Sequence, residues 1–240
     1  MNSHQPNPIS SHMKIKQVIG VMSSKGGVGK SFITGLLATE LSRAGFQVGI
    51  LDADLTAPSI SMLFGVHGPV EKGHYSILPL QTGTGIKIIS PNLLVEDGTQ
   101  PFIWKNAQAG KLIEELYKEV EWGVLDYLII DLPPATSEVT VEVLQSIPFA
   151  GVVIVTQPQE LSTRIVSKAV RLAQKMNVDI VGVIENKSYY LAPNSNEKQF
   201  FFGPSHIDSL SSIANLSILA KLPYSSDFSN LCDLGKIESI

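Results

Sequence analysis

KGGVGKS, at residues 25–31, is the stretch that decides the fold of this chain. An apolar run, VIGVMSS at 18–24, precedes it, and SFITGLLATELSRAG at 31–45 follows it with helical spacing. A strand, a glycine-rich loop and a helix in this order are typical of a phosphate-binding loop. The loop turns backbone N–H groups toward an anion, and the helix adds the positive end of its dipole. A tight glycine turn without a ligand is the alternative.

The residues of this loop have distinct predicted roles. Gly26, Gly27 and Gly29 leave room for the backbone to turn around the anion, because a Cβ would obstruct it. Lys30 is expected to contact the β- and γ-phosphates, and the Ser31 hydroxyl to bind Mg²⁺. The common pattern G-x-x-x-x-G-K-[ST] has glycine at its first position, where this chain has serine. The expected nucleotide-binding set is Ser24, Gly26, Gly27, Val28, Gly29, Lys30, Ser31 and Phe32.

Three aspartates follow two later apolar runs. Asp52 and Asp54 end the second predicted strand, and Asp131 closes YLIID at 127–131. Ligands of open α/β sheets bind at the carboxyl edge of the strands, where these side chains would emerge. Asp131 is expected to hold a Mg²⁺-bound water, since Mg²⁺ takes few direct protein ligands. Asp52 and Asp54 are predicted to point to one side, although each could instead cap the turn that follows.

Short apolar runs alternate with helical patterns along the rest of the chain, which favours a mostly parallel central sheet with helices on both faces. We expect one P-loop NTPase domain over 14–240, and a disordered leader at 1–13. The two segments without clear periodicity, 65–84 and 187–204, are interpreted as functional loops. The predicted strands are 17–23, 47–52, 86–90, 127–131, 151–156 and 180–185. The predicted helices are 31–44, near 110–121, 137–146, 161–176, 206–214 and one near the C-terminus.

Composition excludes several classes of protein. The formal charge is −4 without a basic cluster, which argues against nucleic-acid binding. The apolar runs are far shorter than a membrane helix requires, and the start of the chain lacks a secretory apolar segment. The single cysteine, Cys232, excludes an internal disulfide and fits a reducing cytoplasm. We therefore expect a cytoplasmic protein that binds neither membrane nor nucleic acid.

Five ordered motifs together resemble one known family. The lysine directly before two glycines, together with the carboxylate pair after the next strand, is similar to the deviant Walker A family of P-loop ATPases. The closest likeness is to its Mrp/NBP35 branch, which is associated with iron–sulfur cluster assembly. Besides KGGVGKS, the resemblance rests on LDADLTAPSI (51–60), DYLIIDLPPAT (126–136), TQPQELS (156–162) and IENKSYY (184–190).

This resemblance implies a Mg²⁺-dependent ATPase that works as a homodimer. In the family, the residue at Lys25 reaches across the dimer to the partner's phosphates. The residue at Asp54 orients or deprotonates the attacking water, with Asp52 in support. The predicted catalytic residues are thus Lys25, Lys30 and Asp54, and the predicted metal-binding residues are Ser31, Asp54 and Asp131. A solvated surface lysine is the alternative for Lys25.

The resemblance also implies an adenine site. Asn186 takes the place of an asparagine that reads the base, and its amide offers both a donor and an acceptor. A turn-forming asparagine after a strand is the alternative. Pro223 and Tyr224 match a later base-lining segment loosely. Ala135 replaces a glycine whose N–H lies close to the γ-phosphate in the family. If this position requires a positive φ, alanine is strained there; if not, the change is silent.

The cluster-binding cysteines of the family are missing. Ala192 and Ser195 stand where its C-x-x-C pair would lie. Iron–sulfur clusters are usually held by four cysteine thiolates, whereas a homodimer of this chain supplies only two copies of Cys232. Cys232 is interpreted as a small buried apolar residue in a C-terminal helix. An iron–sulfur cluster is therefore not expected.

Three functions are compatible with these motifs. The first is a slow homodimeric ATPase switch with a client protein in metallocofactor assembly. The second is a positioning ATPase of the partition or septum-site type, which normally carries a basic tail, unlike LCDLGKIESI at 231–240. The third is a nucleotide-sensing partner with little hydrolysis, which Ala135 would allow.

Overall fold

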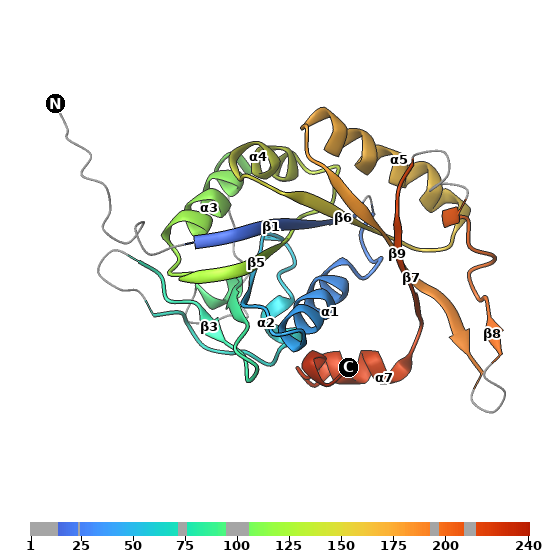
Figure 1. Cartoon of the computed structure of the whole chain (residues 1–240), viewed down its shortest axis with the longest axis horizontal. Coiled ribbons are helices and arrows are strands. Elements are labelled where there is room, and N and C mark those ends of the chain that lie inside the picture. Colours follow the sequence, from blue (N-terminus) through green and yellow to red (C-terminus); the bar gives the residue numbers. More distant parts are fainter. Residues whose placement is uncertain (1–13, 24, 72–75, 95–105, 193–196, 209–214) are drawn as a thin grey trace.

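The computed structural model describes residues 14–23, 25–71, 76–94, 106–192, 197–208 and 215–240. Within these residues one sheet runs through the molecule in the order β3-β4-β2-β5-β1-β6-β7-β8, and β9 also pairs with β7 (Figure 1). The strands are β1 (Lys14–Ser23), β2 (Val48–Asp52), β3 (Leu80–Gln81), β4 (Lys87–Ile89), β5 (Val124–Asp131), β6 (Gly151–Thr156), β7 (Ile180–Leu191), β8 (Lys198–Gln199) and β9 (Ile218–Pro223).

The centre of the sheet is parallel and buried on both faces. β1 lies between β5 and β6, and all three run in the same direction. Every residue of β2 and β6 is buried, which explains why these strands read as continuous apolar runs rather than as alternating ones. The antiparallel pairs are short and lie at the two ends, β3 with β4 and β8 with β7. This confirms the predicted mostly parallel P-loop fold.

Helices cover both faces of the sheet. In Figure 1, α3, α4 and α5 lie above the sheet, whereas α1, α2 and α7 lie below it. The phosphate loop therefore connects the central strand β1 to the helix α1 of the lower layer. The helices are α1 (Lys30–Arg43), α2 (Ile60–Leu63), α3 (Asn106–Glu119), α4 (Glu138–Ser146), α5 (Glu160–Lys175) and α7 (Ser226–Asp233), with 3₁₀ turns η2 (Pro91–Leu93) and η3 (Ile237–Ser239).

The C-terminal segment is fastened to α1. Ile237 is fully buried, and a Cβ on Gly35 of α1 would lie 2.6 Å from its side chain. Arg43, at the end of α1, donates to the carbonyl oxygen of Glu238 at 2.6 Å. Because of these contacts α7 lies close to the helix that begins at the phosphate loop.

The structure confirms the six predicted strands, extends one of them, and adds the strands β3, β8 and β9 and the short helix α2, which were not predicted. β7 does not end at residue 185 but continues to Leu191, so part of the segment predicted as an irregular loop is strand. β9 was not predicted, because its sequence ILAKLP is only partly buried and short. The predicted helix at 206–214 is described only at its start, where residues 207 and 208 are helical, and the predicted leader at 1–13 lies outside the described residues.

Candidate functional site

The phosphate loop joins the end of β1 to the first residue of α1. Gly27 and Gly29 have φ of 79° and 88°, a left-handed conformation that favours glycine. Gly29 is also sterically required, because a Cβ there would lie 2.3 Å from the side-chain nitrogen of Asn186. A Cβ at Gly26 would meet nothing within 4 Å. The space beside Gly26 is thus open toward the position predicted for the phosphates. Ser24 lies outside the described residues.

Lys30, Ser31 and Asp131 meet at the start of α1. The Lys30 ammonium lies 2.7 Å from Asp131 Oδ2, and the Ser31 hydroxyl donates to the same oxygen at 2.6 Å. Thr34 donates to Asp131 Oδ1 at 2.7 Å, a contact that the sequence did not indicate. Lys30 is only 7% exposed and Asp131 is fully buried, so the charges neutralise one another away from water. The structure therefore brings the predicted phosphate lysine and the predicted Mg²⁺ residues together.

Asp52 is a structural acceptor. Its carboxylate accepts from the N–H groups of Ser59 and Ile60, at 3.0 and 3.2 Å, at the start of α2. It also accepts from the Asp54 N–H at 3.2 Å and the Ser90 hydroxyl at 2.9 Å. The alternative interpretation of Asp52, as a cap of the turn, is therefore the one that the structure supports. Burial, together with the nearby charge of Asp131, raises its pKa to about 7.

Asp54 lies beyond the end of β2 and faces the lysine. Its Oδ2 is 3.9 Å from the Lys30 ammonium, and its Oδ1 accepts from the Thr56 hydroxyl at 2.8 Å. The side chain is 13% exposed, whereas Asp52 is fully buried. Asp54 thus caps its own turn and lies next to Lys30 at the start of α1. A second cavity of about 480 Å³ opens beside it, between this turn and the residues from Pro133 to Val139.

Ala135 adopts an ordinary backbone conformation. Positive φ among the described non-glycine residues occurs at 177, 187 and 215, so alanine is unstrained at 135. Its N–H donates to the carbonyl oxygen of Ser23 at 2.8 Å. In this state the N–H is therefore directed at the end of β1.

Lys25 is exposed at the outer side of the loop, and Ser23 Oγ donates to its carbonyl oxygen at 3.0 Å. The salt bridges among the described residues do not include it. An exposed, unpaired ammonium is available to a second subunit, and it equally fits a solvated surface lysine.

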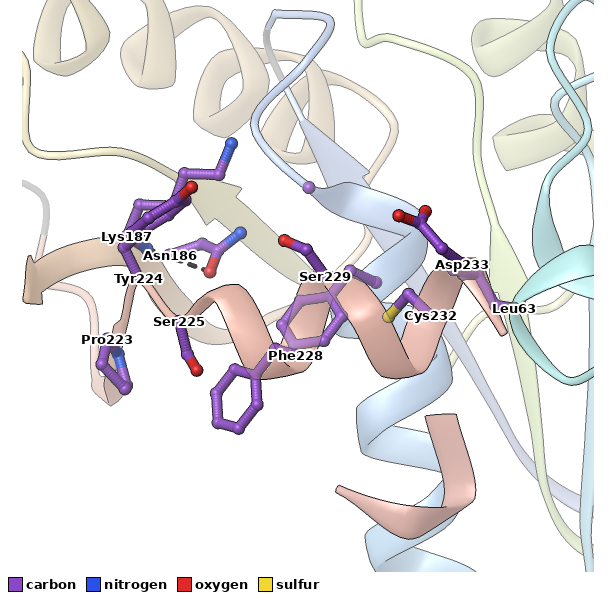
Figure 2. Close-up of a pocket in the computed structure, with 12 residues that line it drawn as sticks. Leu63, Asn186, Lys187, Pro223, Tyr224, Ser225, Phe228, Ser229, Cys232 and Asp233 are labelled. Carbon is purple, nitrogen blue, oxygen red and sulfur yellow. Dashed lines mark hydrogen bonds between the residues drawn. The ribbon is translucent and has the colours of Figure 1, made fainter. Parts of the chain in front are cut away.

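A cavity of about 260 Å³ lies between the phosphate loop, the middle of β7 and α7 (Figure 2). Asn186 lies at one side and is only 3% exposed. Its side-chain N–H donates to the Val28 carbonyl oxygen at 2.9 Å, and its oxygen accepts from the Lys187 N–H at 3.0 Å. One amide hydrogen and one lone pair remain for a ligand. The cavity is lined by Gly29, Phe32, Leu63, Asn186, Lys187, Pro223, Tyr224, Ser225, Phe228, Ser229, Cys232 and Asp233.

The cavity gathers the predicted base residues and adds others. Phe32, Asn186, Pro223 and Tyr224, all predicted from the sequence, line it together. The α7 residues were not predicted, because a short helix with no fully buried residue gives no sequence signal for a binding wall. The rings of Phe32 and Phe228 stack with centroids 6.0 Å apart, which joins α7 to the phosphate-loop helix.

Cys232 differs from its prediction. It lies on α7 as expected, but it is partly exposed at the cavity rather than fully buried. Partial burial, and secondarily the charge of Asp233, raise the pKa of its thiol. The Ala192 N–H donates to the Glu197 carbonyl oxygen at 3.1 Å, and Ser195 lies outside the described residues.

The polar groups around Asp131 fit a Mg²⁺ ion that is shared with phosphate and water better than they fit a metal ion held by protein ligands alone. No cluster of three or more His, Cys, Asp or Glu residues that could hold a metal occurs among the described residues. Mg²⁺ is commonly bound by one or two protein ligands, waters and substrate phosphates. The Ser31 hydroxyl and the Asp131 carboxylate, adjacent to an open phosphate loop, match that donor set.

Comparison with protein families gives a consistent result. The family model of NUBPL iron-transfer P-loop NTPases, in the ParA group, matches residues 14–239. The chain belongs to this family, the Mrp/NBP35-type iron–sulfur cluster carrier P-loop NTPases. It is 39% identical over 232 residues to the iron–sulfur cluster carrier protein of Clostridium perfringens, covering 93% of this chain and 81% of the relative. The corresponding protein of Saccharolobus solfataricus is 36% identical, with coverages of 92% and 76%.

Solved structures agree with this assignment. A nucleotide-binding protein from Archaeoglobus fulgidus in complex with ADP superposes with a TM-score of 0.85 at 38% identity, covering 96% of this chain and 91% of that one. The cell division ATPase MinD of Pyrococcus furiosus has a TM-score of 0.70 at 18% identity, covering 93% and 90%, and shows the shared fold alone. None of the helices among the described residues of this family member is long and apolar enough to cross a membrane.

Proposed function

We propose that the chain is a Mg²⁺-dependent ATP-binding switch that hydrolyses ATP slowly as a homodimer. The observation that carries this proposal is the contact of Lys30, Ser31 and Asp131 beneath an open phosphate loop. The ADP complex of the Archaeoglobus fulgidus relative supports nucleotide binding at this fold. A client protein in metallocofactor assembly is part of the same proposal, and it rests on the iron–sulfur carrier names of the relatives.

The buried charges suggest how the site accepts its ligand. Lys30 now neutralises Asp131, and neither charge can be left unpaired without a large cost. Ser31 and Asp131 would hold Mg²⁺, which would supply positive charge to the phosphate oxygens, and Lys30 would then contact the β- and γ-phosphates. Nucleotide and Mg²⁺ should therefore bind together. We assign to Asp54, whose Oδ2 lies 3.9 Å from the Lys30 ammonium, the role of orienting or deprotonating the attacking water.

Titration calorimetry with ATP, with and without Mg²⁺, tests the phosphate site. Lys30→Ala should weaken MgATP binding roughly 10- to 100-fold, because a charge-assisted hydrogen bond contributes about 1.5–3 kcal/mol. Lys111→Ala is a matched control, since Lys111 is an exposed lysine on α3. Equal affinities for wild type, Lys30→Ala and Lys111→Ala would show that nucleotide binds elsewhere.

We further propose that this chain does not bridge an iron–sulfur cluster in the manner of its relatives. Only one cysteine is present in the sequence, and Ala192 and Ser195 stand at the positions inferred for the thiols. Anaerobic reconstitution with iron and sulfide should give no stable cluster in wild type. The double variant Ala192→Cys with Ser195→Cys should gain cluster absorbance if the hairpin keeps the family geometry. A stoichiometric wild-type cluster that survives Cys232→Ser would contradict the proposal.

A positioning ATPase of the partition type is the second candidate, supported by the fold shared with MinD. Residues 237 and 238 do not form a free basic tail, because Ile237 is buried and the Glu238 carbonyl oxygen accepts a hydrogen bond from Arg43. Co-sedimentation with vesicles or with DNA, in the presence of MgATP, separates the two candidates. A positioning ATPase should be found in the pellet, whereas the switch proposed above should stay in the supernatant.

A further inference from the structure

A buried carboxylate that the proposed reaction does not use lies next to the nucleotide cavity. Glu185 is 1% exposed in the middle of β7. The ion pairs formed by the described residues do not include it. Its two oxygens accept instead from two hydroxyls, those of Ser188 at 2.5 Å and Ser205 at 2.9 Å. A buried carboxylate without a cation is costly, so a structure that keeps one needs both of these donors.

Ser205 connects this carboxylate to an exposed hairpin. We call residues 189–192 and 197–202 the aromatic arm; it contains the end of β7 and all of β8, and extends away from the body in Figure 1. The rings of Tyr190 and Phe201 lie 5.3 Å apart, and the Lys198 ammonium is 4.3 Å above the Tyr189 ring. Phe201 is 65% exposed. Ser205 lies just beyond the arm, where the chain returns to the body.

The next residue along β7 contacts the phosphate loop. Asn186 donates to the Val28 carbonyl oxygen and lines the base cavity. Two consecutive residues thus make contacts on two sides: Asn186 contacts the phosphate loop, and Glu185 contacts Ser188 and Ser205, which flank the arm. The backbone between them and the arm is kinked, because Lys187 has a φ of 55° and the register of β7 against β9 shifts between Glu185 and Tyr189. A left-handed lysine is held only where surrounding contacts fix it.

From this arrangement we infer that Glu185 is a positioning residue that couples the nucleotide state to the aromatic arm. We call Glu185, Ser188 and Ser205 the Glu185 junction. A ligand that engages Asn186 moves the backbone that it shares with Glu185 and Lys187, and the Glu185–Ser205 bond transmits this change to the returning end of the arm. The arm also has a direct contact at the cavity, since the Tyr224 N–H donates to the Tyr189 carbonyl oxygen at 2.7 Å. The inference rests on the proposed nucleotide binding.

Hydrogen-exchange mass spectrometry on the full chain, with and without MgADP, tests this coupling. In wild type, MgADP should slow exchange in peptides of the phosphate loop and should change exchange in peptides covering 186–192 and 197–205. Ser205→Ala removes only the arm side of the Glu185 junction. It should leave MgADP affinity within roughly threefold of wild type. It should reduce the arm response by roughly threefold or more while the phosphate-loop response stays intact.

Two further variants separate coupling from simple stability. Ser205→Thr keeps the hydroxyl and should restore the arm response. Ser146→Ala is the matched control, because the Ser146 hydroxyl contacts only the local Val143 carbonyl oxygen on α4. A stability effect alone would raise arm exchange equally with and without MgADP, and that result would overturn the inference. An unchanged arm response in Ser205→Ala would overturn it as well.

A failure of the proposed function would give a different result from a failure of the coupling. If MgADP protects neither the phosphate loop nor the arm in wild type, nucleotide binding itself is wrong, and the coupling is wrong with it. If the phosphate loop is protected and the arm does not respond, the proposed function stands and the Glu185 junction is only a structural tie.

Discussion

The phosphate-loop end of the sheet and the aromatic arm differ in how their polar groups are satisfied. At the loop, Lys30, Ser31 and Thr34 surround the buried Asp131, with charge paired against charge. At the base of the arm, Glu185 is buried against two neutral hydroxyls. On the proposed function, Asp131 would exchange the Lys30 ammonium for Mg²⁺, and Lys30 would then contact the phosphates. The second arrangement offers no described cation to exchange. The proposed chemistry and the inferred coupling would thus lie in different parts of the sheet.

The largest expected effect concerns the exposed Lys25 of the phosphate loop. Lys25→Ala should lower ATP turnover roughly 10³-fold if its ammonium acts on the partner's phosphates, because cations delivered in trans contribute about 10³–10⁵ for arginine fingers. MgATP affinity should change little. Lys16→Ala, an exposed lysine on β1, is the control. Turnover per subunit that is unchanged on dilution to a demonstrable monomer would exclude the trans role.

The buried carboxyl group of Asp52, at the end of β2, predicts that the free energy of unfolding depends on pH. The pKa of Asp52 is raised to about 7, above its ordinary value of 3.8, so the folded state binds a proton that the unfolded state releases between these two values. Stability from this group is therefore present below pH 4 and lost as the pH rises to 7. The loss is on the order of a few kcal/mol, since each pH unit contributes about 1.4 kcal/mol.

Urea unfolding of the nucleotide-free protein between pH 4 and 8 measures this loss. Asp52→Asn should give a flatter dependence than wild type, because its amide does not titrate. The difference between the two curves measures the contribution of Asp52, including its repulsion with the buried charge of Asp131. Parallel curves would show that the Asp52 proton is not linked to folding.

The preference for ATP over GTP is expected to be a smaller effect than the two described above. GTP should bind at least about tenfold more weakly than ATP, because a pocket with a buried amide penalises a base that leaves its polar groups unpaired. Calorimetry with both nucleotides measures the ratio. Equal affinities would contradict the assignment of Asn186 to the base, while leaving the phosphate site intact.

The smallest effect should come from the arm itself. Phe201→Ser should change the free energy of unfolding by less than about 0.5 kcal/mol, as is usual for an exposed position. Trp122→Phe, in the fully buried core, is the contrasting variant and should cost clearly more. A large loss for Phe201→Ser in the urea midpoint would mean that the arm belongs to the core of the fold.

Local motifs predicted the loop better than the arm. KGGVGKS and its flanks indicated the strand, the glycine-rich turn and the helix that begins near Lys30 and Ser31, because these follow from residues adjacent in sequence. The location of Asp131 beside the loop could be predicted with one further rule, that parallel strands end at the same edge of a sheet. The roles of Thr34 and α7 were missed, since they depend on which helix lies beside which strand.

The base of the arm was missed for another reason. IENKSYY was interpreted as the end of a strand, and the chain instead continues through a kink at Lys187 to Leu191. A left-handed lysine has no sequence signature. The contact of Glu185 with Ser205 joins residues far apart in the chain, and hydroxyls are too common to mark such a contact. Cys232 was predicted as buried because free cysteine usually behaves as a small apolar residue, whereas here it borders a cavity that only the assembled structure forms.

The fastening of α7 to α1 also bears on how the protein is made. The wall of the base cavity comes from residues 223–233, which are translated long after the phosphate loop that they face. On the proposed function, a chain that lacks these residues would have no complete place for the base. Tight nucleotide binding would then be acquired only by a chain synthesised through α7, and bound nucleotide would stabilise such molecules over shorter fragments.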